Sequence, residues 1–253
     1  MNQTNKIWQD KILDVTLHGH FSNPRQQLIS EVIAGQYKVP MPAYLDLVDR
    51  KVNKAFMFAE AWWIISGNNR LCDIRPYMNI YANFSDDGIF LRGAYGPKIV
   101  DQMGHIVDVL EKDNDSRQAV LNIWRERPGG SKDIPCTTNM QFLIRDNKLD
   151  MVTTMRSHDL ILGFTYDVFT FSMVAMSIKL LLHTRGIEVE LGDLYVTAGS
   201  MHIYERHFED CNDWIHSKKT EDISESIEYI KSADSYEELI FMLKNEADKW
   251  LSI

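Results

Sequence analysis

Between residues 133 and 167 the chain gathers residue types that could carry out covalent chemistry. Cys136 follows Ile134-Pro135 and precedes a polar turn, and Arg156 comes later at the end of an alternating, strand-like run. A thiol becomes an effective nucleophile when a nearby cation lowers its pKa. Arg156 could supply that cation if the two strands pair. On residue type alone, Cys136 could equally be a small apolar core residue.

Phosphate recognition is a second possible chemistry. Arg156-Ser157 joins an arginine fork to a hydroxyl, which suits a phosphate group. Arg25 and Arg117 are further phosphate candidates. Any of these arginines could instead form an ordinary surface salt bridge.

Two more sets of polar residues could act on a substrate. Glu60 lies in an apolar, aromatic run, where desolvation would raise its pKa into the range useful for proton transfer. It could also lie on an exposed helix face. His202 and Tyr204 are two positions apart, so on an extended segment they share a face and could hold one sugar hydroxyl. They could equally be partly buried polar residues with structural partners.

Composition limits the classes of protein that fit. The 253 residues are 45% hydrophobic, enough for one sizeable core, and no repeat or linker divides them, so we expect a single domain over 1–253. The net charge of -9 argues against broad electrostatic binding to nucleic acid.

The cysteines and the apolar runs bear on location. Cys72, Cys136 and Cys211 are far apart and odd in number, with no metal-binding spacing, which indicates a reducing compartment and no structural zinc. The N-terminus lacks the apolar core of a signal peptide. The most apolar run, 168–182, is short for a membrane span and contains Lys179. We therefore expect a cytoplasmic protein with no metal and no membrane partner.

Hydrophobic periodicity predicts the helices. A buried helix is expected over 51–66, ending at Gly67, and an amphipathic helix over 97–112. Residues 168–183 predict a buried helix. Ser235 resembles the N-cap of a last helix, in a capping box with Glu238. Pro24 suggests a further helix that ends near Gly35.

Alternation predicts the strands, which cluster in the middle of the chain. They are expected over 118–124, 140–145 and 149–155, over 194–197 and around His202. The second and third should form a hairpin through Asp146-Asn147-Lys148. The mixture indicates an α+β class.

Taken together, these pieces resemble the thymidylate synthase superfamily from about Asn23 to His207. Six elements carry the resemblance, in order: Glu60-x-x-Trp63-x-x-x-Gly67, Tyr95-Gly96, Asp115-Ser116-Arg117, Pro135-Cys136 with Gln141-Phe142, Arg156-Ser157-x-Asp159-x-x-x-Gly163, and His202-x-Tyr204-x-x-His207. Each motif alone is weak, but six in order are specific.

The departures from that pattern point to one branch. Thr137 stands where synthases have histidine after the cysteine, Gln118 replaces the second of a paired arginine, and Ser200 replaces an aspartate. Asp167 replaces the asparagine that reads uracil. This combination resembles the deoxycytidylate 5-hydroxymethyltransferases of T-even-type phages.

An aspartate at position 167 suits cytosine for a chemical reason. Cytosine presents an acceptor at N3 and an amino donor at N4, and a protonated carboxyl can donate to the first and accept from the second. Such a role requires Asp167 to have a raised pKa, which burial would favour.

The resemblance implies a three-layer α+β fold whose mixed β-sheet forms the interface of a homodimer, and a folate-dependent hydroxymethylation of dCMP with 5,10-methylenetetrahydrofolate as co-substrate. It implies catalytic roles for Cys136, Glu60 and Asp167. The implied substrate-binding residues are Arg25, Arg117 from the partner subunit, Tyr95, Gln141, Arg156, Ser157, His202 and Tyr204. Asp159 and Gly163 would bind the folate.

Alternatives within the class are a methylating synthase, or a hydroxymethylase acting on dUMP or CMP. A different class is a non-catalytic nucleotide-binding homologue, against which the retention of Cys136 and Glu60 argues. If the chain is phage-encoded, the compartment would be the host cytoplasm.

Overall fold

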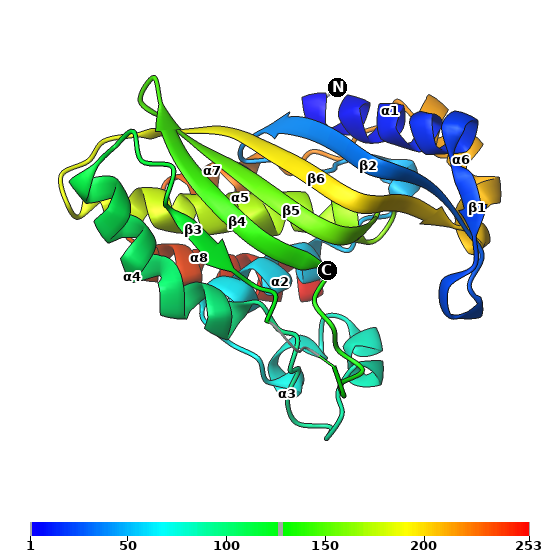
Figure 1. The fold of residues 1–253 in the computed structure, drawn as a ribbon, viewed down its shortest axis with the longest axis horizontal. Coiled ribbons are helices and arrows are strands. Elements are labelled where there is room, and N and C mark those ends of the chain that lie inside the picture. Colours follow the sequence, from blue (N-terminus) through cyan, green and yellow to red (C-terminus); the bar gives the residue numbers. More distant parts are fainter. Residues whose placement is uncertain (1, 126–128, 253) are drawn as a thin grey trace.

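The computed structural model describes residues 2–125 and 129–252. Its centre is a six-stranded sheet with the order β1-β2-β6-β5-β4-β3 (Figure 1). The strands are β1 His20–Ser22, β2 Ile29–Pro40, β3 Val120–Asn122, β4 Thr137–Arg145, β5 Lys148–Asp159 and β6 Glu190–Tyr204. Neighbouring strands are antiparallel except β5 and β6, which are parallel. The sheet is therefore mixed.

Helices build successive layers on the sheet. The α-helices are α1 Gln3–His18, α2 Lys54–Ile65, α3 Leu71–Ile74, α4 Gly96–Lys112, α5 Gly163–His183, α6 Phe208–His216, α7 Ser224–Lys231 and α8 Tyr236–Leu251. Helix α5 packs on β5 and β6, α2 packs against α5, and α8 covers α2. Figure 1 shows these three helices behind the strands. The predicted layered α+β architecture is confirmed.

Helix α5 is the buried crossover that joins the parallel strands β5 and β6, as parallel pairing requires. It is long and apolar enough to pass for a membrane span, but 83% of the apolar window is buried inside the fold. Its hydrophobicity is therefore explained by its place in the core.

Several elements that local sequence signals predict are confirmed. Helix α4 buries Ile99, Met103, Ile106, Val107 and Leu110, as its periodicity predicts. Helix α2 ends before Gly67, whose φ of +74° favours glycine. The β4–β5 hairpin turns at Asp146 and Asn147, with φ of 49° and 59°, as a two-residue turn with the primed geometry requires.

The predicted helix between Pro24 and Gly35 is wrong. Pro24 opens only a 3-10 turn, Pro24–Gln26, in which Arg25 has a φ of 52°, and the chain then enters β2. Pairing with β6 along most of β2 outweighs the helix-start signal. From Gly35 to Val39 the burial alternates as in a strand.

Two other elements differ from the prediction. Helix α1 was not predicted, although Trp8, Ile12 and Val15 are buried on one face at helical spacing. The two strand-like segments around 194–197 and His202 belong to one long strand, β6.

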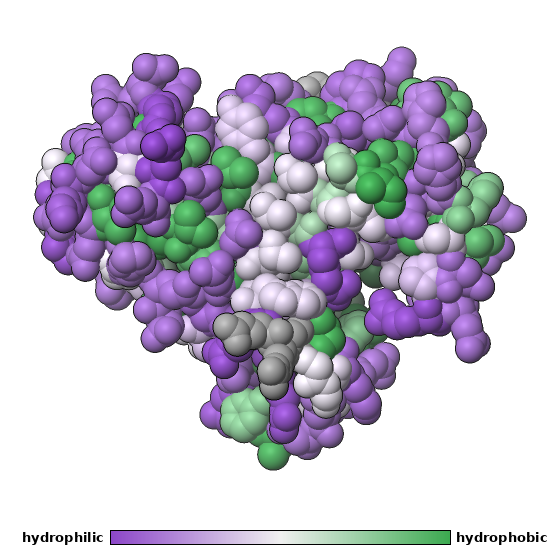
Figure 2. Space-filling model, in the orientation of Figure 1, coloured by the Kyte–Doolittle hydropathy of each residue, from purple (hydrophilic) through white to green (hydrophobic). Residues whose placement is uncertain are grey.

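Figure 2 shows near-neutral residues down the middle of the view, with hydrophilic residues and smaller hydrophobic groups on both sides. Ile33 and Tyr195, on the neighbouring strands β2 and β6, are among the exposed large apolar side chains. The expected homodimer contact through the sheet stays a prediction.

The capping signal of α8 can be tested. The Ser235 side chain accepts a hydrogen bond from the Glu238 N–H at 3.1 Å, and the Glu238 carboxylate accepts one from the Asp234 N–H at 2.8 Å. Ser235→Ala should lower the free energy of unfolding by about 1 kcal/mol in urea denaturation. Ser235→Thr, which keeps the acceptor, is the control. Equal stability of the alanine and threonine variants would show that the cap contributes nothing.

Candidate active site

A β-bulge places the thiol opposite a guanidinium. Asn139 of β4 pairs with Thr154 of β5, but Thr137 pairs with Met155, so Thr138 is an extra residue. The shift brings Cys136 opposite Arg156, whose N–H donates to the Cys136 carbonyl at 2.8 Å. Without the bulge the same pairing would put Ser157 there. Residues that face each other across strands share a face, and bulges re-aim side chains in this way.

Arg156 holds the segment that carries the nucleophile. Its Nε donates to the Pro135 carbonyl at 3.0 Å and its Nη2 to the Ile134 carbonyl at 3.1 Å. Nη2 also lies 3.6 Å from the Cys136 Sγ. The proximity expected from the sequence is confirmed.

The thiol is nevertheless not ionised by this contact. Burial raises the pKa of Cys136 above its ordinary value and outweighs the opposite effects of Arg156 and Arg25, while Asp167 raises it further. The thiol therefore stays protonated at neutral pH, and its proton must leave as it attacks.

Glu60 projects from α2 and is only 8% exposed. The Tyr81 hydroxyl donates to its Oε1, and Thr170 Oγ1 donates to Oε2 at 3.4 Å. Burial, followed by the charge of Asp167, raises the pKa of Glu60 to about 8. The alternative of an exposed helix face is therefore wrong, while the role of Glu60 in proton transfer stays a prediction.

Asp167 lies one turn into α5, and 19% of its side chain remains exposed, so it is open to a ligand. Burial raises its pKa, Asp159 adds to the effect, and His158 opposes it. A neutral carboxyl is what reading of cytosine requires.

Tyr95 links these groups. It stands just before α4, and its hydroxyl accepts a hydrogen bond from the Thr137 N–H at 3.2 Å. Burial and the charges of Cys136 and Asp167 raise its pKa well above the usual range. Tyr95, Cys136, Asp167 and, through Asp167, Glu60 therefore form one electrostatically connected cluster.

The parallel pair β5–β6 brings the expected sugar and phosphate residues together. Ser157 is opposite Ser200, and Asp159 is opposite His202. The rings of His202 and Tyr204 are 5.0 Å apart, edge to face, so they share a face as expected. Burial lowers the pKa of His202, which keeps its ring neutral.

Asp159 and Gly163 bracket the turn into α5. The Asp159 Oδ1 accepts hydrogen bonds from the Ile161 N–H at 2.7 Å and the Leu162 N–H at 3.3 Å. Leu162 is 40% exposed beside it. Gly163 leaves room for its neighbours, because a Cβ there would lie 3.3 Å from both Asp167 Oδ2 and His158 Nδ1.

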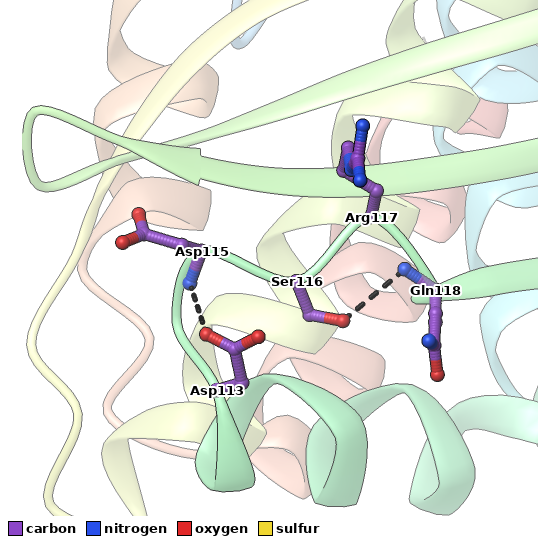
Figure 3. Close-up of a pocket in the computed structure, with 5 residues that line it drawn as sticks. All are labelled: Asp113, Asp115, Ser116, Arg117 and Gln118. Atoms are coloured by element: carbon purple, nitrogen blue, oxygen red, sulfur yellow. Dashed lines mark hydrogen bonds between the residues drawn. The ribbon is translucent and has the colours of Figure 1, made fainter.

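Two expected substrate residues lie elsewhere in this chain. Arg117 is on the loop between α4 and β3, and this loop lines a polar pocket. The Arg117 side chain points away from Asp113 (Figure 3). Gln141 donates to the Arg117 carbonyl at 2.9 Å. Arg117 and Gln141 therefore lie at the start of β3. Cys136 lies near the other end of that strand, where the Trp124 N–H donates to the Thr138 carbonyl.

Several residues of the site were missed by the sequence analysis. Tyr81 and Thr170 hold Glu60, and His158 and Tyr37 lie behind Asp167. His158 is adjacent to Asp159, and only that adjacency could have signalled it. Among residues 2–125 and 129–252, no group of three metal-binding side chains was found.

The raised pKa of Glu60 predicts a pH-dependent stability. The folded protein binds the Glu60 proton more tightly than the unfolded chain does, so this stabilisation is complete below about pH 4.5 and is lost as pH rises to about 8. Glu60→Gln keeps the shape without the titration. In urea unfolding, it should gain roughly 2–4 kcal/mol relative to wild type between pH 5 and pH 8.5.

Glu225→Gln makes the same chemical change at an exposed position and is the control. A Glu60→Gln protein that follows the wild type at both pH values would mean that the carboxyl is not desolvated.

Comparisons with known proteins agree with this geometry. Residues 6–245 match the family model for thymidylate synthase. Relatives named deoxyuridylate hydroxymethyltransferase occur in Bacillus phage SP01 (27% identical over 79% of this chain and 56% of the relative), Pseudomonas phage M6 (29%, 70% and 52%) and Delftia phage PhiW-14 (29%, 72% and 54%). The chain thus spans about half the length of these relatives.

Thermostable thymidylate synthase A from Bacillus subtilis shares the fold, with a TM-score of 0.70, 20% identity and 86% of each chain covered. The family match covers most of the chain and includes the bulged cysteine strand, the Glu60 helix and the Arg156 strand. The chain belongs to the thymidylate synthase family.

Proposed function

We propose that this protein hydroxymethylates dCMP at C5, using 5,10-methylenetetrahydrofolate and water and releasing tetrahydrofolate. The family consists of one-carbon transferases that act on pyrimidine nucleoside monophosphates with this folate. The observation that carries the choice of base is Asp167, a carboxyl with a raised pKa that is electrostatically coupled to the Cys136 thiol.

The base-reading role follows from hydrogen-bond chemistry. A neutral Asp167 can donate to the cytosine N3 and accept from its N4 amino group. Donation to N3 also stabilises the electron-rich ring that forms when a nucleophile adds at C6. An ionised carboxylate could accept from the N4 amino group but has no hydrogen to donate to N3, so the raised pKa of Asp167 supports the assignment.

The covalent steps use Cys136. Its Sγ adds to C6 of the pyrimidine, its proton leaves, and C5 becomes nucleophilic. The bound folate supplies a one-carbon unit at the oxidation level of formaldehyde. The one-carbon unit bonds to C5, and loss of the C5 proton together with cleavage of the bond to tetrahydrofolate leaves an exocyclic methylene on the ring. Water adds to this methylene, C6–Sγ cleaves, and Cys136 is restored.

Glu60 suits the proton transfers of these steps. A carboxyl whose pKa is about 8 exchanges protons readily near neutral pH, because its two forms are both populated. The Tyr81 and Thr170 hydroxyls fix its orientation. We assign to it the removal of protons and the placement of water.

The phosphate and sugar would be held around the β5–β6 pair. Arg156 lies beside the nucleophile, Arg25 is close enough to lower the pKa of Cys136, and Ser157 lies opposite Ser200 on β6. His202 and Tyr204 would hold the 3′-hydroxyl. Arg117 and Gln141 lie away from this site, so Arg117 would have to come from a second copy of the chain in the expected homodimer.

The residues at the start of α5 fit a folate. A pterin carries N–H donors and flat apolar faces. Asp159 is a carboxylate that uses Oδ1 for local backbone bonds, and Leu162 presents an exposed apolar side chain beside it. Asp159 and the turn at Gly163 would therefore hold the pterin.

Hydroxymethylation of dUMP is the second candidate. It is favoured by the phage relatives, which carry the name deoxyuridylate hydroxymethyltransferase. A neutral carboxyl can also pair with uracil if its proton lies on the other oxygen.

A product assay separates these functions. The protein would be incubated with methylenetetrahydrofolate and dCMP, dUMP or CMP, and the nucleotides analysed by mass spectrometry. We expect the mass of a hydroxymethyl group on dCMP. The same gain on dUMP alone would favour the second candidate, a methyl gain would indicate a synthase, and no product with any nucleotide would indicate a binding-only homologue.

The covalent role of Cys136 makes a specific prediction. Cys136→Ser should lower turnover by at least about a thousandfold, because the weaker nucleophile cannot form the adduct. It should keep nucleotide affinity in calorimetry, since Arg156 and Ser157 remain. Cys72→Ser, an exposed cysteine outside the site, is the control. Near-normal turnover of Cys136→Ser would contradict the mechanism.

The proposed role of Asp167 makes a second prediction. In Asp167→Asn the amide cannot deliver a proton to N3, so the rate with dCMP should fall. The amide can present an acceptor to the uracil N3–H, so the preference should shift toward dUMP by about tenfold or more, as measured by competition between the two nucleotides. An unmoved preference would mean that Asp167 does not read the base.

A further inference from the structure

A buried chain of polar groups runs from Asp167 through His158 to Tyr37. His158, near the end of β5, is 1% exposed, and its Nε2 lies 2.8 Å from the Tyr37 hydroxyl. Its Nδ1 lies 3.5 Å from Asp167 Oδ2. Tyr37 comes from β2, which is separated from β5 by β6. Strands β2 and β5 and helix α5, which are distant in sequence, thus bring Tyr37, His158 and Asp167 together.

The chain is held by close packing. Phe164 lies 4.7 Å from the Tyr37 ring and 6.2 Å from the His158 ring, centroid to centroid. The rings of Tyr37 and His158 stack at 5.7 Å. Gly163 leaves space for the approach of Nδ1 to Oδ2. The arrangement is therefore built by the fold and is not a chance contact at the surface.

The Nδ1 atom is the informative one. It is buried and has no hydrogen-bond partner among the described residues. A buried polar atom without a partner is costly, and Asp167 Oδ2 lies just beyond hydrogen-bond distance. A small movement on ligand binding would complete the bond.

We propose that Tyr37 and His158 form a relay that fixes which oxygen of Asp167 carries the proton, and thereby sets the preference between cytosine and uracil. The inference rests on the proposed base-reading role of Asp167. Tyr37 and His158 are positioning residues in it, because neither needs to touch the substrate.

The donors and acceptors of Tyr37, His158 and Asp167 determine which atom donates in each hydrogen bond. Burial raises the pKa of Tyr37, so its hydroxyl keeps a hydrogen to donate. When that hydroxyl donates to Nε2, the neutral imidazole carries its own hydrogen on Nδ1 and points it at Oδ2. An imidazolium would also donate from Nδ1. In both states Oδ2 is an acceptor, so the carboxyl hydrogen lies on Oδ1.

The position of that hydrogen decides the base. A neutral carboxyl pairs with cytosine when its hydroxyl faces N3, and with uracil when its hydroxyl faces O4 and its other oxygen accepts from N3–H. In the proposed function Oδ1 faces N3, and Oδ2 accepts from both the N4 amino group and His158. Binding of uracil would require the hydroxyl at Oδ2, and a hydroxyl oxygen is a weaker acceptor for the His158 N–H than the carbonyl oxygen of the other form.

The test compares variants of the full chain in competition between dCMP and dUMP with methylenetetrahydrofolate. Tyr37→Phe removes only the hydroxyl, so His158 can carry its hydrogen on Nε2 and accept from Asp167. The ratio of the dCMP to the dUMP rate should fall about fivefold to tenfold, the size of one net hydrogen bond. His158→Leu should lower the same ratio.

Phe164→Leu is the matched control, because it loosens the packing around both rings and removes no hydrogen bond. It should lower both rates together and keep the ratio. A Tyr37→Phe ratio within twofold of wild type, or a loss of both rates in parallel, would overturn the relay.

Nitrogen NMR of the histidine rings gives a readout that does not depend on activity. Wild-type His158, assigned by comparison with His158→Leu, should carry its ring hydrogen on Nδ1, and an Nε2–H tautomer would overturn the relay. A wild-type enzyme that uses dUMP and not dCMP would overturn the proposed function instead, and the tautomer would then decide the relay alone.

Discussion

The burial of ionisable groups between the sheet and helices α2 and α5 is the constraint on which the site depends. Glu60 and Asp167 both have raised pKa values there, and the Cys136 thiol stays protonated in spite of Arg156. Removing these groups from water costs free energy that the apolar helices around them must offset. The Glu60 carboxyl, whose pKa is raised to about 8, can as a result exchange a proton near neutral pH, which ordinary carboxyls in water do not do.

Much of the scaffold that holds these groups could be predicted from local sequence. The amphipathic period of α4, the turn chemistry of the β4–β5 hairpin and the cap of α8 act within a few residues, so the sequence shows them directly. β2 was mistaken for a helix because Pro24 is a local signal, whereas the pairing of β2 with β6 is a long-range one. Strand identity depends on such partners more than helix identity does.

The residues of the site also divide into those that the sequence reveals and those whose roles depend on long-range contacts. Cys136, Arg156, Glu60 and Asp167 were found because their residue types are unusual in their settings and because the family pattern joins them. Tyr37, His158 and Tyr81 are common residue types, and their roles arise only when separate elements meet. The burial that sets each pKa is a property of the whole fold, so no single segment reveals it.

The bulge at Thr138 gives that residue an unusual status. Its hydroxyl donates only to the Thr154 carbonyl across the hairpin, so many side chains could replace it without loss of a reacting group. What matters is that Thr138 stays outside the regular pairing, because a slip that paired it with Met155 would set Cys136 opposite Ser157 and move the guanidinium away from the thiol. Selection in this strand should therefore act on the register of the two strands and hardly on the residue type at position 138, so aligned relatives should vary freely at this column.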